Sequence, residues 1–314
     1  MSLWGKGEAV GPLLRRARVA RGFACARRRA RPALLCFGVA VGVVAFPAVA
    51  GATMPGHNGR IAFTRDDTVG SVLPDGTGFQ VIAKNNPAHG DCFGMPAYAP
   101  GGDRLALAGC GDFGMYFGNA DGSDLKGFVV SAADVVETPS WSRGGGRLVF
   151  TGCDGDDENC AIYRMRSDGT GERRLASGYQ GAWGSGGRIA YTGPDLPIVT
   201  MNANGKRRRR VPHTTSHDGL PDWSPNGRRL TFTRFYEDTA SVFVIDANGR
   251  HRRLLARRAV DSVWSPDGTK LAFARLDTDP ETEDDTWNIY TVNADGSAIQ
   301  RVAAGLQPDW QPLR

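Results

Sequence analysis

The sequence predicts an all-β protein: a six-bladed β-propeller closed by a C-terminal strand that completes its N-terminal blade. Three observations carry this prediction. A repeat recurs every 41 to 44 residues, each repeat contains the same two-residue turn, and the two ends hold complementary partial repeats. Repeats of this length with several short strands are typical of propellers, in which each repeat supplies one four-stranded blade.

The repeat is clearest in WSPDGTKLAFAR (Trp264–Arg275) and WSPNGRRLTFTR (Trp223–Arg234). Weaker copies begin at Tyr98, Trp141 and Trp183. An aliphatic residue marks each copy, and successive markers are 44, 43, 41, 41 and 41 residues apart, at Ile61, Leu105, Leu148, Ile189, Leu230 and Leu271. The spacing predicts six units.

Each unit divides into four expected strands. The first carries the Trp or Tyr, and the second alternates large and small side chains, as in LAFA after Lys270. The third is rich in β-branched and aromatic residues and ends in Asp-Gly or Asn-Gly, the pairs that favour a type I′ hairpin turn. These turns are Asp75-Gly76, Asp121-Gly122, Asp168-Gly169, Asn204-Gly205, Asn248-Gly249 and Asp295-Gly296. The fourth strand is polar and is expected at the outer edge.

The two ends of the repetitive region complement each other. His57–Arg65 (HNGRIAFTR) begins at the turn before a second strand and lacks a first strand, whereas Pro308–Pro312 (PDWQP) repeats Pro221–Pro225 (PDWSP) and lacks a second strand after it. We therefore expect the C-terminal strand to pair into the N-terminal blade, which removes the exposed sheet edges of an open array.

Charge is distributed unevenly along the 314 residues. The pI of about 9.0 suggests a nucleic-acid partner, but residues 1–50 hold nine basic residues and one acidic residue, which leaves 29 basic and 32 acidic residues in 51–314. The basic character belongs to the N-terminal segment, so nucleic acid is not an expected partner.

The N-terminal segment, 1–52, has the order of an export signal. An arginine-rich stretch precedes the apolar run Ala33–Phe46, and small residues follow at Ala48-Val49-Ala50. We expect a signal peptide or an N-terminal membrane anchor formed by residues 33–50, which places the protein in the periplasm, at the cell surface or outside the cell. The alternatives are an anchor that was never a signal and a start codon assigned too far upstream.

The propeller repeats resemble a known family. The form P-x-W-S-P-D-G-x-x-L-x-F, seen in Pro221–Phe232, Ser262–Phe273 and Pro139–Phe150, is similar to the WD-like propeller family that includes the C-terminal domain of TolB. The resemblance covers residues 56 to 312 and implies a TolB-like propeller over 56–314. The motif is specific for the fold and gives little information about function. We expect the propeller to be a monomer.

Four cysteines follow the targeting segment, an even number that favours disulfides in an exported protein. Cys153 and Cys160 flank a loop between two expected strands, where a hairpin brings them opposite each other. Cys110 occupies the same repeat position as Cys153, which makes Cys92 its expected partner. The alternative is free, buried thiols.

Metal sites are weaker hypotheses. His89, His213 and His217 lie in connections between blades, and propeller-fold lyases that act on pectin fragments hold a metal with histidines around their channel. Asp154, Asp156 and Glu158 alternate as calcium ligands often do. The alternatives are loop histidines without a metal and a solvated acidic turn; the acidic stretch from Asp277 to Asp285 is interpreted in the same way.

Lys206–Arg210 (KRRRR) is the most basic run of the propeller and is expected on an outer strand. It could contact an anionic polymer such as teichoic acid or an acidic polysaccharide, or lipid headgroups. The alternative, which the sequence favours, is an edge strand kept soluble by its charge.

Catalytic signatures are absent from the sequence: it contains no G-x-S-x-G, no phosphate-binding loop and no C-x-x-C. We expect an exported, non-catalytic propeller that acts as a protein- or ligand-binding module of the cell envelope, with no cofactor unless calcium binds the acidic loops. The alternative function is a metal-dependent polysaccharide lyase or hydrolase that uses the central channel.

Overall fold

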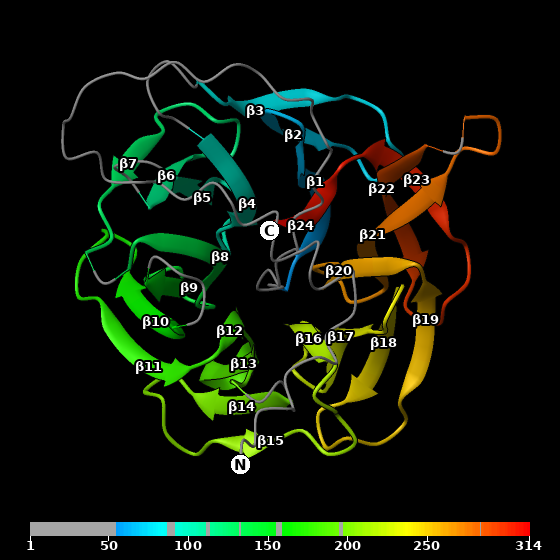
Figure 1. Cartoon of the computed structure of the whole chain (residues 1–314). Helices are drawn as coiled ribbons and strands as arrows, with labels where there is room; N and C mark the ends of the chain where they lie inside the picture. The colour runs from blue at the N-terminus through cyan, green and yellow to red at the C-terminus, as the bar shows by residue number, and fades with distance from the viewer. Residues whose placement is uncertain are drawn as a thin grey trace, which may run out of the picture.

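The computed structural model describes residues 55–86, 92–110, 114–131, 133–154, 159–194, 197–282 and 284–314. In these residues, 24 strands form six four-stranded antiparallel sheets, which are arranged as blades around a central axis (Figure 1). The protein is a six-bladed β-propeller, as the sequence predicts.

In every blade the strands run from the centre to the rim in the order first to fourth. Blade I consists of β24 (Leu306–Leu313), β1 (His57–Arg65), β2 (Thr68–Val72) and β3 (Gln80–Lys84), and blade II of β4 (Cys92–Tyr98), β5 (Arg104–Cys110), β6 (Met115–Asn119) and β7 (Lys126–Phe128). Blade III consists of β8 (Val135–Trp141), β9 (Arg147–Asp154), β10 (Asn159–Arg166) and β11 (Arg173–Ser177), and blade IV of β12 (Tyr179–Trp183), β13 (Arg188–Thr192), β14 (Ile198–Asn202) and β15 (Arg209–Arg210), with the 3₁₀ turn η1 (Ser185–Gly187) between its first two strands. Blade V consists of β16 (Asp218–Trp223), β17 (Arg229–Phe235), β18 (Ala240–Asp246) and β19 (Arg253–Arg257), and blade VI of β20 (Ala259–Trp264), β21 (Lys270–Thr278), β22 (Asp285–Asn293) and β23 (Gln300–Ala304).

The ring closes within blade I. β24 pairs antiparallel with β1, with Trp310 opposite Ile61 and Leu313 opposite His57. One detail differs from the sequence-based expectation: Asn58-Gly59 does not lie in a turn but within β1, where the ladder shifts register. The two ends of the propeller run past each other here as paired strands, because no covalent turn has to join them.

The core lies between neighbouring blades. The second strand of each blade is sandwiched there, and Phe63, Phe150, Phe232 and Phe273 are fully buried. The first-strand aromatics are buried beside them; Trp141, for example, donates its indole N–H to the backbone oxygen of Ala97 in the preceding blade at 2.9 Å. The large and small alternation of the sequence therefore reflects packing on both faces of each sheet.

The turns between third and fourth strands hold the blades together at the rim. Only the Gly of each Asp-Gly or Asn-Gly pair adopts positive φ, whereas a type I′ turn requires it at both central residues, so the turn type predicted from the sequence is wrong. Gly122 has φ +87°, and a Cβ built on it would lie 1.9 Å from the backbone oxygen of Ile82 in blade I. Only glycine fits this close approach. The neighbouring Asp121 accepts hydrogen bonds from the backbone and side chain of Ser123, which lower its pKa.

Candidate functional site

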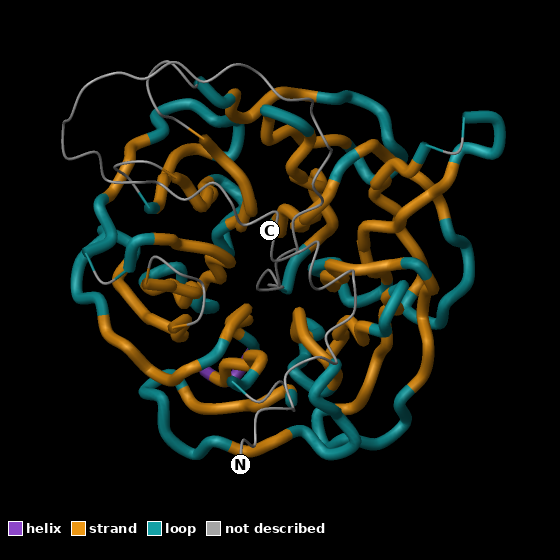
Figure 2. Tube along the Cα trace, viewed as in Figure 1, coloured by secondary structure: helices purple, strands orange, loops and turns teal. Residues whose placement is uncertain are grey.

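One face of the propeller carries the connections between second and third strands together with the blade-to-blade connections. We call this the loop face, and its described parts include 66–67, 129–131, 133–134, 211–217, 236–239 and 279–282. Figure 2 shows these connections as loops between the strands, and the loop between β21 and β22 projects beyond its neighbours. Loops held by a rigid scaffold are the usual place for binding residues.

In blade III, the loop between the second and third strands begins at a disulfide. Cys153 and Cys160 lie opposite each other in the β9–β10 ladder, with 4.0 Å between their Cα atoms and an S–S bond of 2.00 Å. Asp154 is exposed beside it, whereas Asp156 and Glu158 lie outside the described residues. Calcium binding by this loop stays a prediction.

The other cysteine pair occupies the corresponding place in blade II. Backbone pairing between β4 and β5 sets Cys92 opposite Cys110. This register is the one that a bridge requires, but the side chain of Cys110 lies outside the described residues, so the pairing stays a prediction.

Of the three candidate metal-binding histidines, the structure describes His213 and His217, and it gives them separate environments. His213 is exposed and its Nδ1 is 2.8 Å from the backbone oxygen of Gly249, whereas the Nδ1 of His217 is 3.4 Å from the Oγ of Ser216. His89 lies outside the described residues. Among the described residues, no group of three or more His, Cys, Asp or Glu side chains could hold a metal ion.

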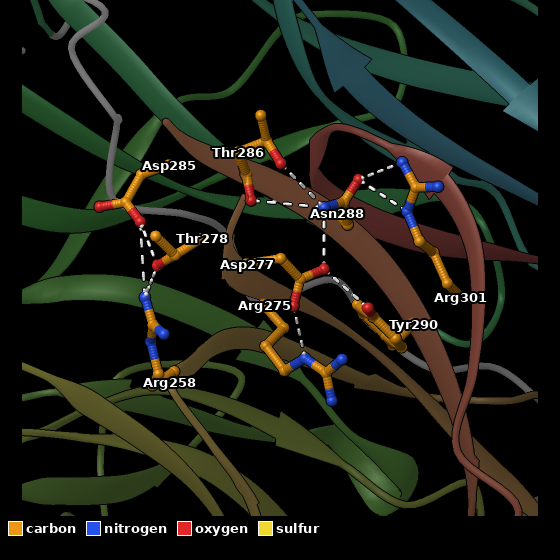
Figure 3. A network of polar contacts seen from close by, with 9 residues as sticks. All are labelled: Arg258, Arg275, Asp277, Thr278, Asp285, Thr286, Asn288, Tyr290 and Arg301. Atoms are coloured by element: carbon orange, nitrogen blue, oxygen red, sulfur yellow. Dashed lines mark hydrogen bonds and ion pairs between the residues drawn. The ribbon is translucent and has the colours of Figure 1, made fainter. Parts of the chain in front are cut away.

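The longest hairpin of the loop face is stiffened by a network of polar side chains (Figure 3). Asp277 accepts hydrogen bonds from Arg275 Nε at 3.0 Å, Asn288 Nδ2 at 2.9 Å and Tyr290 Oη at 2.7 Å. Burial acts to raise its pKa, but the bonds from Tyr290 and Arg275 outweigh it, and the pKa of Asp277 lies below its usual value. The sequence suggested that Asp277 belongs to a solvated acidic stretch. The structure instead places its carboxylate in a network of three hydrogen bonds.

Two further contacts extend this network to the neighbouring segments. Arg301 on β23 donates two hydrogen bonds to Asn288 Oδ1, at 2.9 and 2.7 Å. At the hairpin's tip, Arg258 contacts the hydroxyl of Thr278 at 2.7 Å, and that hydroxyl donates to Asp285 at 2.6 Å (Figure 3). The hairpin is therefore fixed both to the outer strand of blade VI and to the connection from blade V.

A second set of residues surrounds the central axis. Each innermost strand has a β-bulge at which one residue adopts positive φ between +54° and +61°: Met95, Thr138, Gln180, Leu220, Asp261 and Gln307. Bulges re-aim side chains and are frequent near functional sites. We call these six residues the bulge ring.

Hydrogen bonds link the bulge ring from blade to blade. Gln307 Oε1 accepts the backbone N–H of Met95 at 3.3 Å, and Met95 Sδ accepts that of Thr138 at 3.5 Å. The hydroxyls of Thr138 and Thr151 are hydrogen-bonded to each other at 2.7 Å. The Thr151 hydroxyl accepts the backbone N–H of Gln180, and Gln180 Oε1 accepts the backbone N–H of Leu220. A polar collar thus runs from blade I to blade V.

Asp261 differs from the rest of the ring. It is fully buried, and neither carboxylate oxygen has a hydrogen bond of normal geometry within the described part of the chain. Burial raises its pKa well above the ordinary value, and only the backbone N–H of Gln307 acts in the opposite direction. A buried, unpartnered carboxyl is energetically costly and is held neutral instead.

Two more buried carboxyls lie just beyond the ring positions of their strands. Asp309 accepts the N–H of Tyr98 at 2.7 Å, and Asp222 accepts the N–H of Trp264 at 2.9 Å, each in the next blade. Ser140 makes the same contact with Trp183 at 2.7 Å. Burial, and then the charge of Asp222, raise the pKa of Asp309 well above its usual value.

Sequence reasoning did not identify the bulge ring or these carboxyls. The Pro-Asp-Trp tripeptide at Pro221 and Pro308 was the one usable signal, since it places an acid one residue before a buried aromatic.

In the described residues, no helix is long and apolar enough to cross a membrane.

The geometry defines a class of protein: a closed six-bladed propeller with a rigid loop face and a polar central collar. No family model matches the chain. A curated relative is the Tol-Pal system protein TolB of Anaeromyxobacter dehalogenans, 26% identical over 119 residues; the match covers 36% of this chain and spans 26% of that protein.

Solved structures extend the likeness to the whole fold. The crystal structure of TolB from Acinetobacter baumannii superposes with a TM-score of 0.68 at 17% identity, over 81% of this chain and 67% of that chain. An oligogalacturonate lyase in complex with manganese gives a TM-score of 0.51 at 14% identity, over 76% and 70% of the two chains. The fold of this chain is that of a TolB-like six-bladed propeller, and at these identities the likeness shows the fold alone.

Proposed function

We propose that this chain is an exported, non-catalytic binding module of the cell envelope, and that the loop face of its propeller holds a protein partner. The observation that carries the proposal is the Asp277 network, which fixes the longest hairpin of that face before any partner arrives. A binding element that is already ordered loses less conformational entropy on association, so more of its contact energy becomes affinity.

The similarity to TolB supports the location and the class of partner. The relative from Anaeromyxobacter dehalogenans is named as a protein of the Tol-Pal system. For this chain we take residues 1–52 as an export signal or anchor and 56–314 as the module, which acts as a monomer on an envelope protein. No catalytic residue is assigned in this proposal.

Site-specific photo-cross-linking in intact cells tests the loop face directly. A photoreactive side chain replaces Tyr236, which is 43% exposed in the loop between β17 and β18, or Thr282 at the tip of the blade VI hairpin. The matched control carries it at Val81, which is 52% exposed on the outer strand of blade I. We expect one cross-linked species of defined mass from the loop positions and none from Val81.

The variant Asp277→Ala separates binding from mere proximity. It removes the acceptor that three side chains share, so the hairpin loses its fixed position, and cross-linking from Thr282 should fall while that from Tyr236 is less affected. Equal cross-linking from all three positions, or none from the loops in cells that export the protein, contradicts the proposal.

The lyase alternative is tested on the same purified protein. The fold is shared with an oligogalacturonate lyase that binds manganese. Elemental analysis of protein never exposed to chelator should find no stoichiometric transition metal if the binding proposal is correct. A metal that is lost in His213→Ala or His217→Ala would favour the enzyme instead.

A further inference from the structure

The basic residues of the propeller gather on neighbouring blades. Residues 179–217, which form blade IV and its connection, contain six basic residues and one acidic residue, and residues 218–258 of blade V contain eight and five. Residues 259–305 of blade VI show the opposite balance, with three basic and nine acidic residues. The ring therefore has a basic arc and an acidic arc rather than mixed charge all round.

Within the basic arc, the charges lie on the rim. Lys206, Arg207, Arg208, Arg209 and Arg210 are all exposed at the outer edge of blade IV, as are Arg173 and Arg174 on β11 and Arg250, Arg252 and Arg257 on or beside β19. We call these ten residues the basic belt. Figure 1 shows β11, β15 and β19 following one another along the rim.

Hydrogen bonds from arginine side chains to backbone oxygens connect the three blades of the belt. Arg208 donates to the backbone oxygen of Leu175 in blade III at 2.5 Å, and Arg252 of blade V donates to the backbone oxygen of His213 at 3.2 Å. The belt is thus continuous from β11 across β15 to β19.

Acidic side chains of the described residues do not neutralise the belt. In the part of the chain that the structure describes, none of its ten residues forms an ion pair, although ion pairs occur at Arg234–Asp218 and Arg275–Asp277. Repulsion between like charges is present as well: after burial, the charges of Arg147 and Arg173 lower the pKa of Arg164. Such an arrangement is unfavourable unless an anion is present.

Protection of a sheet edge does not account for this charge. The outer strands of blades I, II and VI are edges of the same kind, yet β3, β7 and β23 carry one basic residue each, at Lys84, Lys126 and Arg301. One charge per edge suffices there against pairing with another chain. The additional arginines of blades III to V therefore serve another purpose.

We propose that the basic belt binds a linear anionic polymer of the cell envelope, one that carries repeated phosphate or carboxylate groups. Guanidinium groups bind both kinds of oxyanion with paired hydrogen bonds. The belt crosses three of the six blades of a ring, so its outer strands face directions about 60° apart. A flexible chain can follow this convex rim, whereas a flat bilayer meets only one blade edge at a time. The polymer site and the loop face are separate surfaces, so the two proposals stand independently.

The test measures the affinity of purified propeller for two fluorescent probes, sodium polyphosphate and polygalacturonate, by fluorescence anisotropy at several salt concentrations. The belt variant is Lys206→Gln/Arg207→Asn/Arg209→Gln; Asn suits the positive φ of Arg207, and Arg208 and Arg210 are kept because both contact backbone oxygens. The control Lys84→Gln/Lys126→Gln/Arg314→Gln removes the same net charge from exposed positions outside the belt.

We expect at least one polymer to bind at low salt and to be released as salt rises, with affinity at least about tenfold weaker in the belt variant and changed less than about twofold in the control. Arg250→Gln/Arg257→Gln in blade V should weaken binding in the same way. This second variant keeps the proposal testable if the first belt variant does not fold. Equal losses in belt and control variants, or no binding of either polymer, would overturn the proposal. So would belt-dependent flotation with phosphatidylglycerol vesicles without polymer binding, which would assign the belt to a bilayer. Cross-linking from Tyr236 should be unchanged in the belt variant.

Discussion

Replacing Asp261 should make the protein more stable at neutral pH. The side chain is fully buried and its carboxylate oxygens lack hydrogen bonds of normal geometry, so burial holds its pKa well above the ordinary value. Leu220 occupies the same bulge position in blade V, with φ +56° against +61°, and is also buried. The scaffold therefore accepts an apolar side chain at this position, and Asp261→Leu is the substitution to make, with Asp261→Asn as a neutral variant of matched shape.

The size of the effect follows from proton linkage. Above a pH of about 4 the carboxyl ionises in the unfolded chain but stays protonated in the folded protein, so the unfolded chain binds fewer protons. The contribution of Asp261 to the free energy of unfolding consequently falls as pH rises, by about 1.4 kcal/mol per pH unit, until the pH reaches the folded-state pKa. Both variants remove this loss.

Urea unfolding at pH 5, 6, 7 and 8 measures this contribution as the difference between wild type and variant. We expect the advantage of both variants to grow with pH until the pH reaches the folded-state pKa of Asp261, and the reverse change, Leu220→Asp, to destabilise more at pH 8 than at pH 5. A difference between wild type and Asp261→Asn that does not vary with pH would refute the reasoning, because it would mean that Asp261 titrates alike in the folded and unfolded states.

Three further predictions concern closure, turns and the disulfide. Trp310→Ala removes a buried side chain from the strand that closes the ring and should lower the free energy of unfolding in urea by about 3–5 kcal/mol; a loss below about 1 kcal/mol would mean that closure contributes little. Gly122→Ala should destabilise by about 1–3 kcal/mol, because φ is +87° and the added Cβ meets a backbone oxygen, whereas Gly144→Ala, with open space around it, should change thermal stability by less than half as much. Cys153→Ser/Cys160→Ser should cost about 2–3 kcal/mol under oxidising conditions, the chain-entropy value for a short loop; equal stability of wild type and variant would show that the bridge is not formed.

The blades could be predicted from the sequence because their determinants are local. Alternating side chains on the second strand, an aromatic on the first, and Asp-Gly or Asn-Gly at the outer turn each act within a few residues, and six copies reinforce one another. Closure was also predictable. Pro308–Pro312 repeats a first-strand segment but is not followed by a second strand, and His57–Arg65 is a second strand that no first strand precedes.

The bulge ring could not be predicted in this way. Its residues are Met, Thr, Gln, Leu, Asp and Gln, which share no chemistry, and what they have in common is a backbone dihedral that the sequence does not display. The Asp277 network was missed for a related reason: Asp277 meets Asn288 and Tyr290 only through the pairing register of β21 and β22, and in sequence it looks like one acid among several.

The closure in blade I also determines how the ring responds to mechanical load. His57 and Leu313 are paired at the same end of the β1–β24 ladder, so a force that separates the two ends of the propeller acts on this pair first. The hydrogen bonds are then loaded one after another, as in a zipper, rather than all together as in shear. A force that pulls the N-terminus and the C-terminus apart would therefore separate β24 from β1 at a small force. The other five blades, in which a turn joins the first and second strands, would stay folded.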